Sequence, residues 1–368
     1  MFIAEFAIRI AAPQQLILIR PDLWEPADTV GWVHRPNVDI EINTGERTVS
    51  VFTDEAGFRV GANGPVDADR KVLLLGDSFM EALQVDYEAS SPGLIEAALP
   101  ELVGEPVALR NAGVGGWDPD QYLLRAQSLL AREDFDLVVT ALFMGNDVIR
   151  VRRDYVPPRS PVERHQLRMP RGFSWTEFVD AFLRPLNDAL EVRSHAFVLV
   201  KNRMQNARRE VGLDALPFPR YFMRSASPNP RWAVTARLCE DIAALAAEHG
   251  SEALFVLVPT SFQVDPADLM DNVRGFDLDI DAIDLEQPNR MLSAELTSRG
   301  LRFHDVLEGF RARHESGERL FGTVDRHFSP EGNRLFADLV APRIADALLG
   351  DEPGADGRSG GGGGRGEQ

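Results

Sequence analysis

Short apolar runs alternate with stretches of helical periodicity along most of the chain. The apolar runs lie at residues 71–75, 107–110, 137–143, 253–258 and 302–304. Helical patterns lie between them, notably at 119–132 and 232–249, and a last one covers 330–349. Such runs are typical of parallel strands buried on both faces, and strands alternating with helices form a parallel sheet between two helical layers. We therefore expect an α/β fold, a three-layer α/β/α sandwich with a central parallel sheet.

Two parts of the chain depart from this alternation. Residues 30–60 alternate polar and apolar side chains, most clearly in Val38–Ile42 and Thr48–Thr53, which predicts a β-hairpin ahead of the sheet. Residues 151–231 are rich in arginine, proline and aromatic residues. An insertion of this length at a strand end commonly builds a lid or a substrate wall.

The sequence thus predicts three parts. Residues 1–69 form a helix and a β-hairpin-like prelude packed on the main domain, residues 70–349 form that domain, and residues 350–368 form a disordered glycine-rich tail. Within the main domain, the insertion carries one helix around 175–190, and residues 262–290 form a second, acidic insertion.

Composition removes several classes of function. The formal net charge of −18 gives an acidic surface, which repels nucleic-acid phosphates, so we expect no nucleic-acid partner. Cys239 is the only cysteine, which excludes an intrachain disulfide and a cysteine cluster for a metal. Its helical neighbours Leu238, Ile242 and Leu245 predict a buried thiol rather than a catalytic one.

Apolar stretches are too short for a membrane span. None reaches the ~18 uninterrupted apolar residues that a spanning helix needs, and Glu5 and Arg9 interrupt the apolar start. The start also lacks the features of a signal peptide. Taken as written, the chain is expected to be cytoplasmic. Because Met1 opens inside an amphipathic pattern, a true start upstream would make it membrane-associated or periplasmic.

Ser78 is the first candidate for chemistry. It lies in Gly76-Asp77-Ser78, directly after an apolar run and before a helical pattern. α/β proteins place their sites at such strand ends, and a helix N-terminus favours developing negative charge. Ser78 is thus positioned as a nucleophile whose own N–H can face an oxyanion. The simpler alternative is a serine that only caps the helix.

Two further segments follow the next two apolar runs. Asn111 to Gly116 contains three glycines, which let the backbone approach a ligand closely and offer an N–H to an oxyanion. Asn146, in Gly145-Asn146-Asp147, carries an amide that can donate to an oxyanion and cannot ionise. The simpler alternatives are a glycine-rich turn and an Asx-turn at a strand exit.

A base for Ser78 is available near the end of the chain. His327 precedes the last helical pattern, and its imidazole titrates near neutrality. Asp325 can orient that imidazole and stabilise its cation. Ser329 and Pro330 then read as the helix N-cap and first helical residue. The simpler alternative is an acidic loop with a surface histidine.

The remaining histidines lack an acidic partner on a strand-end loop, and the nearest competitor, His304-Asp305, lies where a strand should end. No metal-binding motif is present, so we expect neither a metal nor an organic cofactor.

The four segments that contain Ser78, Gly116, Asn146 and His327 occur in this order along the chain. Together they resemble the SGNH/GDSL hydrolase family over roughly residues 70–150 and 235–348. The prelude, with Gly31 to Asn37, is similar to that of a bacterial subgroup. The resemblance implies a flavodoxin-like sheet, Ser78 as nucleophile, His327 as base and Asp325 as orienting acid. It also implies an oxyanion hole of Ser78 N–H, Gly116 N–H and the Asn146 amide, with Gly115 as a neighbouring alternative. Many members space the acid and histidine as Asp-x-x-His, whereas Asp325 lies two residues before His327.

The implied activity is an esterase that cleaves an O-acyl bond through an acyl-enzyme. Small-molecule, glycan and lipid esters all remain open as substrates. Two alternatives also remain: an O-acyltransferase on the same scaffold, and a binding module that kept the fold without turnover.

Overall fold

A computed structural model describes residues 5–8, 22–44, 46–147, 190, 194, 196–200, 218–226, 231–323 and 326–350. Several expectations therefore lie outside the described residues: the helix around 175–190, most of the insertion 151–231, the tail after Gly350, and Asp325.

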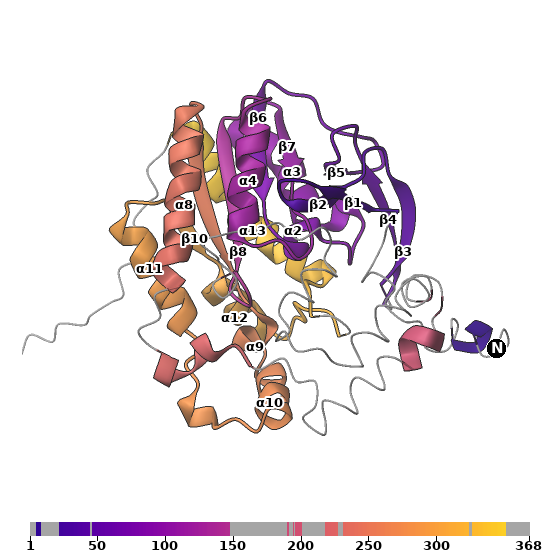
Figure 1. Ribbon diagram of the computed structural model, residues 1–368, viewed down its shortest axis with the longest axis vertical. Coiled ribbons are helices and arrows are strands. Elements are labelled where there is room, and N and C mark those ends of the chain that lie inside the picture. Colours follow the sequence, from indigo (N-terminus) through magenta and orange to yellow (C-terminus); the bar gives the residue numbers. More distant parts are fainter. Residues whose placement is uncertain are drawn as a thin grey trace, which may run out of the picture.

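A parallel five-stranded sheet forms the centre of the molecule (Figure 1). Its strands are β6 (Arg70–Leu75), β7 (Val107–Asn111), β8 (Leu137–Phe143), β9 (Glu252–Val258) and β10 (Phe303–Asp305). Their order across the sheet is β10-β9-β8-β6-β7, with every neighbouring pair parallel. This is the flavodoxin-like order, in which ligands bind at the carboxyl ends where the chain switches direction across the sheet. Here that point lies between β6 and β8.

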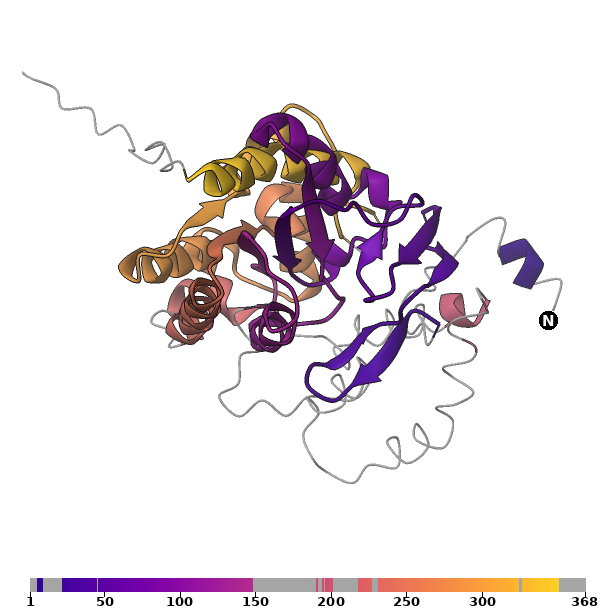
Figure 2. The same cartoon turned by 90° about the horizontal axis from the view of Figure 1, so that it is seen from above.

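Helices cover both faces of the sheet, as the apolar runs predict (Figures 1 and 2). One face packs against α4 (Pro119–Leu130), α8 (Arg231–Glu248) and α11 (Gln287–Ser298). The other packs against α3 (Ser91–Val103), α12 (Leu307–Glu315) and α13 (Pro330–Leu349). Along β6, Leu73 and Leu75 enter the first core, while Val72 and Leu74 enter the second. The expected three-layer α/β/α fold is confirmed.

Two small antiparallel sheets lie beside the main domain (Figure 2). β3 (Asp39–Asn43) pairs with β4 (Thr48–Thr53), as the sequence predicts, and β5 (Arg59–Val60) extends the pair to three strands. The other sheet is a hairpin of β1 (Trp24–Ala27) and β2 (Gly31–His34), which the sequence pattern does not predict.

Further short helical elements lie between these layers and around them in the chain. They are α2 (Ser78–Glu81), η1 (Tyr87–Ala89), η2 (Arg220–Phe222), η3 (Arg224–Ala226), α9 (Ser261–Val264), α10 (Pro266–Gly275) and η4 (Ile280–Ala282). The acidic insertion at 262–290 contains most of α9, then α10, η4 and the first residues of α11. Among the residues described, no helix has the length and apolar character needed to cross a membrane.

Candidate active site

Ser78 begins α2 directly after β6, and it does not cap that helix. Asp77 is the N-cap residue: its Oδ1 accepts a hydrogen bond of 2.9 Å from the N–H of Phe79. The Ser78 hydroxyl lies instead 2.7 Å from Nε2 of His327, although 249 residues separate the two along the chain. The simpler capping role thus belongs to Asp77, and the Ser78 side chain faces an imidazole.

The His327 loop is a tight hairpin that leads into α13. The N–H of Gly322 donates to the carbonyl oxygen of His327 at 2.8 Å, and the N–H of Ser329 donates to that of Leu320 at 3.0 Å. Ser329 caps α13 by accepting from the N–H of Gly332, as its position before Pro330 predicts. The ring of Phe79 lies against the imidazole, with centroids 4.9 Å apart. These contacts fix the imidazole next to Ser78.

Two residues of this hairpin, Thr323 and Arg326, are anchored by side chains from other parts of the chain. On one side, the N–H and hydroxyl of Thr323 donate to Oε1 of Glu46, at 2.6 and 2.8 Å. On the other, Arg326 forms an ion pair of 2.8 Å with Asp268 of α10. Burial raises the pKa of Asp268, while a hydrogen bond from Ser261 and the charge of Arg326 lower it. Asp325 lies in the chain between the two anchors, outside the described residues, so its expected role as orienting acid stays a prediction.

The glycine-rich loop after β7 packs directly on α2. The amide of Asn111 donates to the carbonyl oxygen of Met80 at 2.9 Å, and its oxygen accepts from the N–H of Gly113 at 3.1 Å. A Cβ atom on Gly113 would lie 2.9 Å from the backbone nitrogen of Glu81. The loop thus needs a glycine there because the backbone of α2 passes so close.

Gly115 and Gly116 are required for different reasons. A Cβ atom on Gly115 would lie 2.6 Å from Oε2 of Glu81, whereas Gly116 has a φ of +80°, which residues with a Cβ rarely adopt. Both residues are partly exposed. The described geometry therefore leaves both glycines open as the backbone donor.

Asn146 lies in the turn after β8, at the same edge of the sheet as Ser78. The N–H groups of Asn146 and Asp147 both donate to the carbonyl oxygen of Phe143. The Asx-type bond of this turn comes from Asp147, whose Oδ2 accepts from the N–H of Phe143 at 2.8 Å. Within the described residues, Oδ1 of Asn146 is buried without a hydrogen-bond partner. The Asn146 side-chain oxygen therefore does not close the turn.

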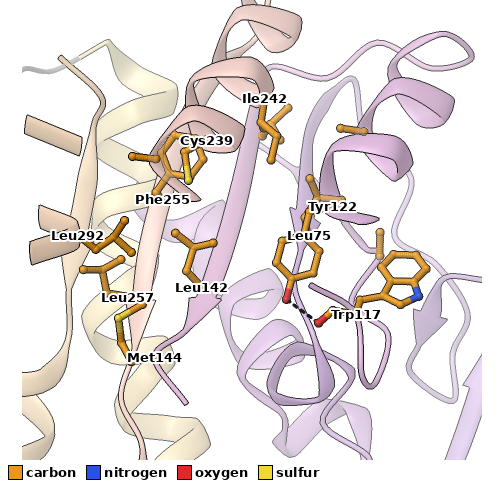
Figure 3. Close-up of a cluster of buried hydrophobic side chains, with 14 of the residues drawn as sticks. Leu75, Trp117, Tyr122, Leu142, Met144, Cys239, Ile242, Phe255, Leu257 and Leu292 are labelled. Carbon is orange, nitrogen blue, oxygen red and sulfur yellow. Dashed lines mark hydrogen bonds between the residues drawn. The ribbon is translucent and has the colours of Figure 1, made fainter. Parts of the chain in front are cut away.

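Asp147 is a fully buried carboxyl group that sustains this turn. Its Oδ2 also accepts from the hydroxyl of Tyr122 at 3.1 Å. Burial raises its pKa well above the usual range, and the nearby charges of Asp77 and Asp118 raise it further. Figure 3 shows Tyr122 and Met144 among the buried hydrophobic side chains of one core. The hydroxyl of Tyr221 donates to the carbonyl oxygen of Met144 at 2.8 Å, which fixes the start of the turn.

A buried network on the far side of α2 was missed by the sequence analysis. Oε1 of Glu81 accepts from Nε1 of Trp24 at 2.8 Å and lies 2.6 Å from Nε2 of His34. The guanidinium of Arg59 donates to the carbonyl oxygens of Glu81, Ala82 and Val85, at 2.5, 2.6 and 2.6 Å. Burial lowers the pKa of Arg59 to about 10, although Glu81 opposes this. No short motif signals these contacts because each joins residues distant in sequence.

The competing candidates have structural roles. His304 lies in β10, and burial lowers its pKa. Asp305 accepts from the amide of Asn289 and the N–H of Leu307. Cys239 is buried, as expected, and burial raises the pKa of its thiol. The described residues contain no group of three histidine, cysteine or acidic side chains that could hold a metal ion.

Comparison with known proteins gives one family match. Residues 218–359 match the family described as SGNH hydrolase-like domain, acetyltransferase AlgX, a part of the chain that contains His327 but not Ser78. No curated protein was found to match the sequence.

Solved structures of lipolytic proteins and esterases also match. A member of the lipolytic G-D-S-L family from Veillonella parvula is 11% identical, with a TM-score of 0.39 over 74% of this chain and 96% of that one. A catalytic mutant of the acetylxylan esterase Axe2 from Geobacillus stearothermophilus is 10% identical, with a TM-score of 0.40 over 78% and 97%. A lipase/acylhydrolase from Enterococcus faecalis is 13% identical, with a TM-score of 0.38 over 75% and 95%.

The four motifs occur in the order that the SGNH/GDSL pattern requires, and the described ones lie at the carboxyl edge of a sheet with the flavodoxin-like strand order. The family match adds the C-terminal part of the chain. The motifs of this chain thus resemble those of the SGNH/GDSL hydrolases, and residues 218–359 match the model of an SGNH hydrolase-like domain.

Proposed function

We propose that this protein is a serine esterase that cleaves an O-acyl bond by acyl-enzyme chemistry. The observation that carries the proposal is the 2.7 Å contact between the Ser78 hydroxyl and Nε2 of His327. A serine hydroxyl is a weak nucleophile until a neighbouring base takes its proton, and this contact provides the base.

In the proposed reaction, the Ser78 oxygen attacks the ester carbonyl carbon while His327 accepts the hydroxyl proton. The tetrahedral intermediate collapses, and His327 returns the proton to the leaving alcohol. Water then attacks the acyl-serine, with His327 again as base, and releases the acid and free Ser78. Asp325 is proposed to hold the imidazole in the required orientation and to stabilise its cation.

The oxyanion is proposed to accept hydrogen bonds from the Ser78 N–H, the Gly116 N–H and the Asn146 amide. Two features support this set. The three residues follow β6, β7 and β8, whose carboxyl ends lie side by side in the sheet, and the Asx-type bond of the turn after β8 comes from Asp147 rather than from the Asn146 side-chain oxygen. Each such donor is typically worth ~3–4 kcal/mol of activation free energy.

A second candidate function is O-acyl transfer, in which a hydroxyl group replaces water in the second step. The observation that favours it is the match of residues 218–359 to a family described as an acetyltransferase. The two functions share the acyl-enzyme and differ only in the acceptor. A glycan or a lipid is proposed as the ester substrate for either one.

The test is hydrolysis of p-nitrophenyl esters of rising chain length and of an acetylated polysaccharide, with and without a soluble glycan as acceptor. We expect Ser78→Ala and His327→Ala each to remove turnover while the circular dichroism spectrum and the melting temperature stay close to those of the wild type. Acylated glycan formed in preference to free acid would favour transfer. Full activity in purified Ser78→Ala would refute both functions.

A further inference from the structure

The indole of Trp32 holds the peptide unit between Gly115 and Gly116. Nε1 of Trp32 donates a hydrogen bond of 3.1 Å to the carbonyl oxygen of Gly115. That carbonyl and the N–H of Gly116 belong to one planar trans peptide, so they point in opposite directions. Fixing the Gly115 oxygen therefore also fixes the direction of the Gly116 N–H.

We propose that Trp32 is a positioning residue of the oxyanion hole, which orients the Gly116 N–H by binding the carbonyl oxygen on the other side of the same peptide. The inference rests on the proposed function. Of the two glycines left open above, it assigns Gly116 as the backbone donor to the oxyanion, because a peptide held through the Gly115 oxygen presents the N–H of Gly116.

Trp32 is itself rigidly held. Its side chain is 1% exposed, and its residue lies in β2, paired with Pro26 of β1. Nε1 of Trp117 donates to the carbonyl oxygen of Trp32 at 3.1 Å. The Trp32 ring also lies next to Gly116, where a Cβ atom would be 3.4 Å from Cζ2. The indole can therefore transmit a fixed position to the loop.

The same hairpin also fixes the helix that carries Ser78. Trp24 of β1 and His34 of β2 both contact Oε1 of Glu81, three residues after Ser78. One rigid hairpin thus binds both α2 and the glycine-rich loop. The β1–β2 hairpin, which precedes the sheet, therefore adds contacts to both elements beyond the direct packing of the loop on α2.

The decisive variant is Trp32→Phe, which keeps an aromatic ring but removes the N–H donor. Ser251→Ala is the matched control, because the Ser251 hydroxyl donates to the carbonyl oxygen of Phe135 at 2.6 Å, and neither residue is part of the proposed site. In Trp32→Phe we expect kcat to fall about tenfold or more with KM within about twofold, since an oxyanion donor acts in the transition state. The Ki of a boronic acid, which forms a tetrahedral adduct, should rise by a similar factor.

Further measurements separate positioning from loss of fold. Rates are normalised to the fraction of molecules that a fluorophosphonate labels at Ser78, and hydrogen exchange of the peptide containing residues 111–118 is compared among the proteins. We expect faster exchange there in Trp32→Phe only. If Trp32→Phe does not fold, Trp117→Phe replaces it, with a smaller decrease in kcat expected.

These measurements distinguish failure of the Trp32 inference from failure of the proposed esterase function. If the wild type turns over with Ser78 and Trp32→Phe matches Ser251→Ala in kcat and boronic-acid Ki, Trp32 has no positioning role while the esterase stands. If KM alone rises, Trp32 shapes the substrate site and the inference is wrong. If the wild type itself shows no Ser78-dependent turnover, the proposed function fails, and this inference fails with it.

Discussion

Adjacent residues have different tasks at both described turns of the site. Asp77 caps α2, which leaves the Ser78 hydroxyl to contact His327. Asp147 closes the turn after β8, and the side-chain oxygen of Asn146 has no hydrogen-bond partner among the described residues. In each pair, a buried carboxyl group accepts the backbone hydrogen bond, and its neighbour is the residue proposed to take part in the reaction.

Asn146→Ala tests the side chain that this division leaves available. Because the amide is proposed to bind the oxyanion rather than the ground-state ester, we expect kcat to fall by ~10²–10³ with little change in KM. Steady-state kinetics on a p-nitrophenyl ester measures both constants. A rise in KM with an unchanged kcat would make Asn146 a substrate-binding residue instead.

Asp147→Asn tests the buried carboxyl group through pH. Burial raises the pKa of Asp147 in the folded protein above the ordinary value of ~3.9 for the unfolded chain. Between the unfolded-state and folded-state pKa values, the folded protein therefore binds more protons than the unfolded chain. The wild type loses stability as pH rises through this interval. Asparagine can still accept from Phe143 and Tyr122 but cannot ionise.

We therefore expect the free energy of unfolding of Asp147→Asn, relative to the wild type, to increase between about pH 5 and about pH 8. Urea denaturation at both values measures this difference. If the difference in free energy of unfolding between Asp147→Asn and the wild type is the same at both pH values, Asp147 does not retain its proton in the folded protein.

At the scale of elements, α2 depends on partners from the N-terminal sheets. It has only four residues, which is too few to be stable alone. Arg59 of β5 binds three carbonyl oxygens at and beyond its C-terminal end, while Trp24 and His34 bind Glu81. The prelude is thus part of the support of the proposed nucleophile.

Arg59→Met tests how much the hydrogen bonds of Arg59 contribute to the stability of the folded protein. The change removes the Arg59 donor from three carbonyl oxygens, of which that of Ala82 still accepts from the N–H of Val85 at 3.3 Å. We expect a loss of about 2 kcal/mol or more in the free energy of unfolding. Arg274→Met is the control, because Arg274 is exposed on α10 and should change stability by less than about 0.5 kcal/mol. Equal losses in urea denaturation would contradict the assigned role of Arg59.

Elements differ in how far the sequence predicted them. β8 and β9 were predicted because most of their residues are apolar and buried on both faces, with Thr140 and the exposed Glu252 as the exceptions. β1 was not, because Trp24–Ala27 is short, contains Pro26 and shows no alternation. A proline is tolerated there since β1 pairs on one side only.

At the scale of the whole molecule, the order of motifs and the family resemblance that it carries predicted that Ser78 and His327 would meet, and the Ser78 hydroxyl lies 2.7 Å from Nε2 of His327. The Glu81–His34 and Trp32–Gly115 contacts could not be predicted in this way. They depend on how the β1–β2 hairpin docks on the main domain, and neither a motif nor a period encodes that position.

The central claim is that Ser78 becomes acylated with His327 as its base. It is tested most directly by mass spectrometry of the protein after brief reaction with p-nitrophenyl acetate and acid quench, followed by mapping of the modified peptide. The account predicts one acetyl group on Ser78 in the wild type and at least about 10³-fold slower acetylation in His327→Ala. Acetylation at another residue, or at an equal rate in His327→Ala, would contradict it.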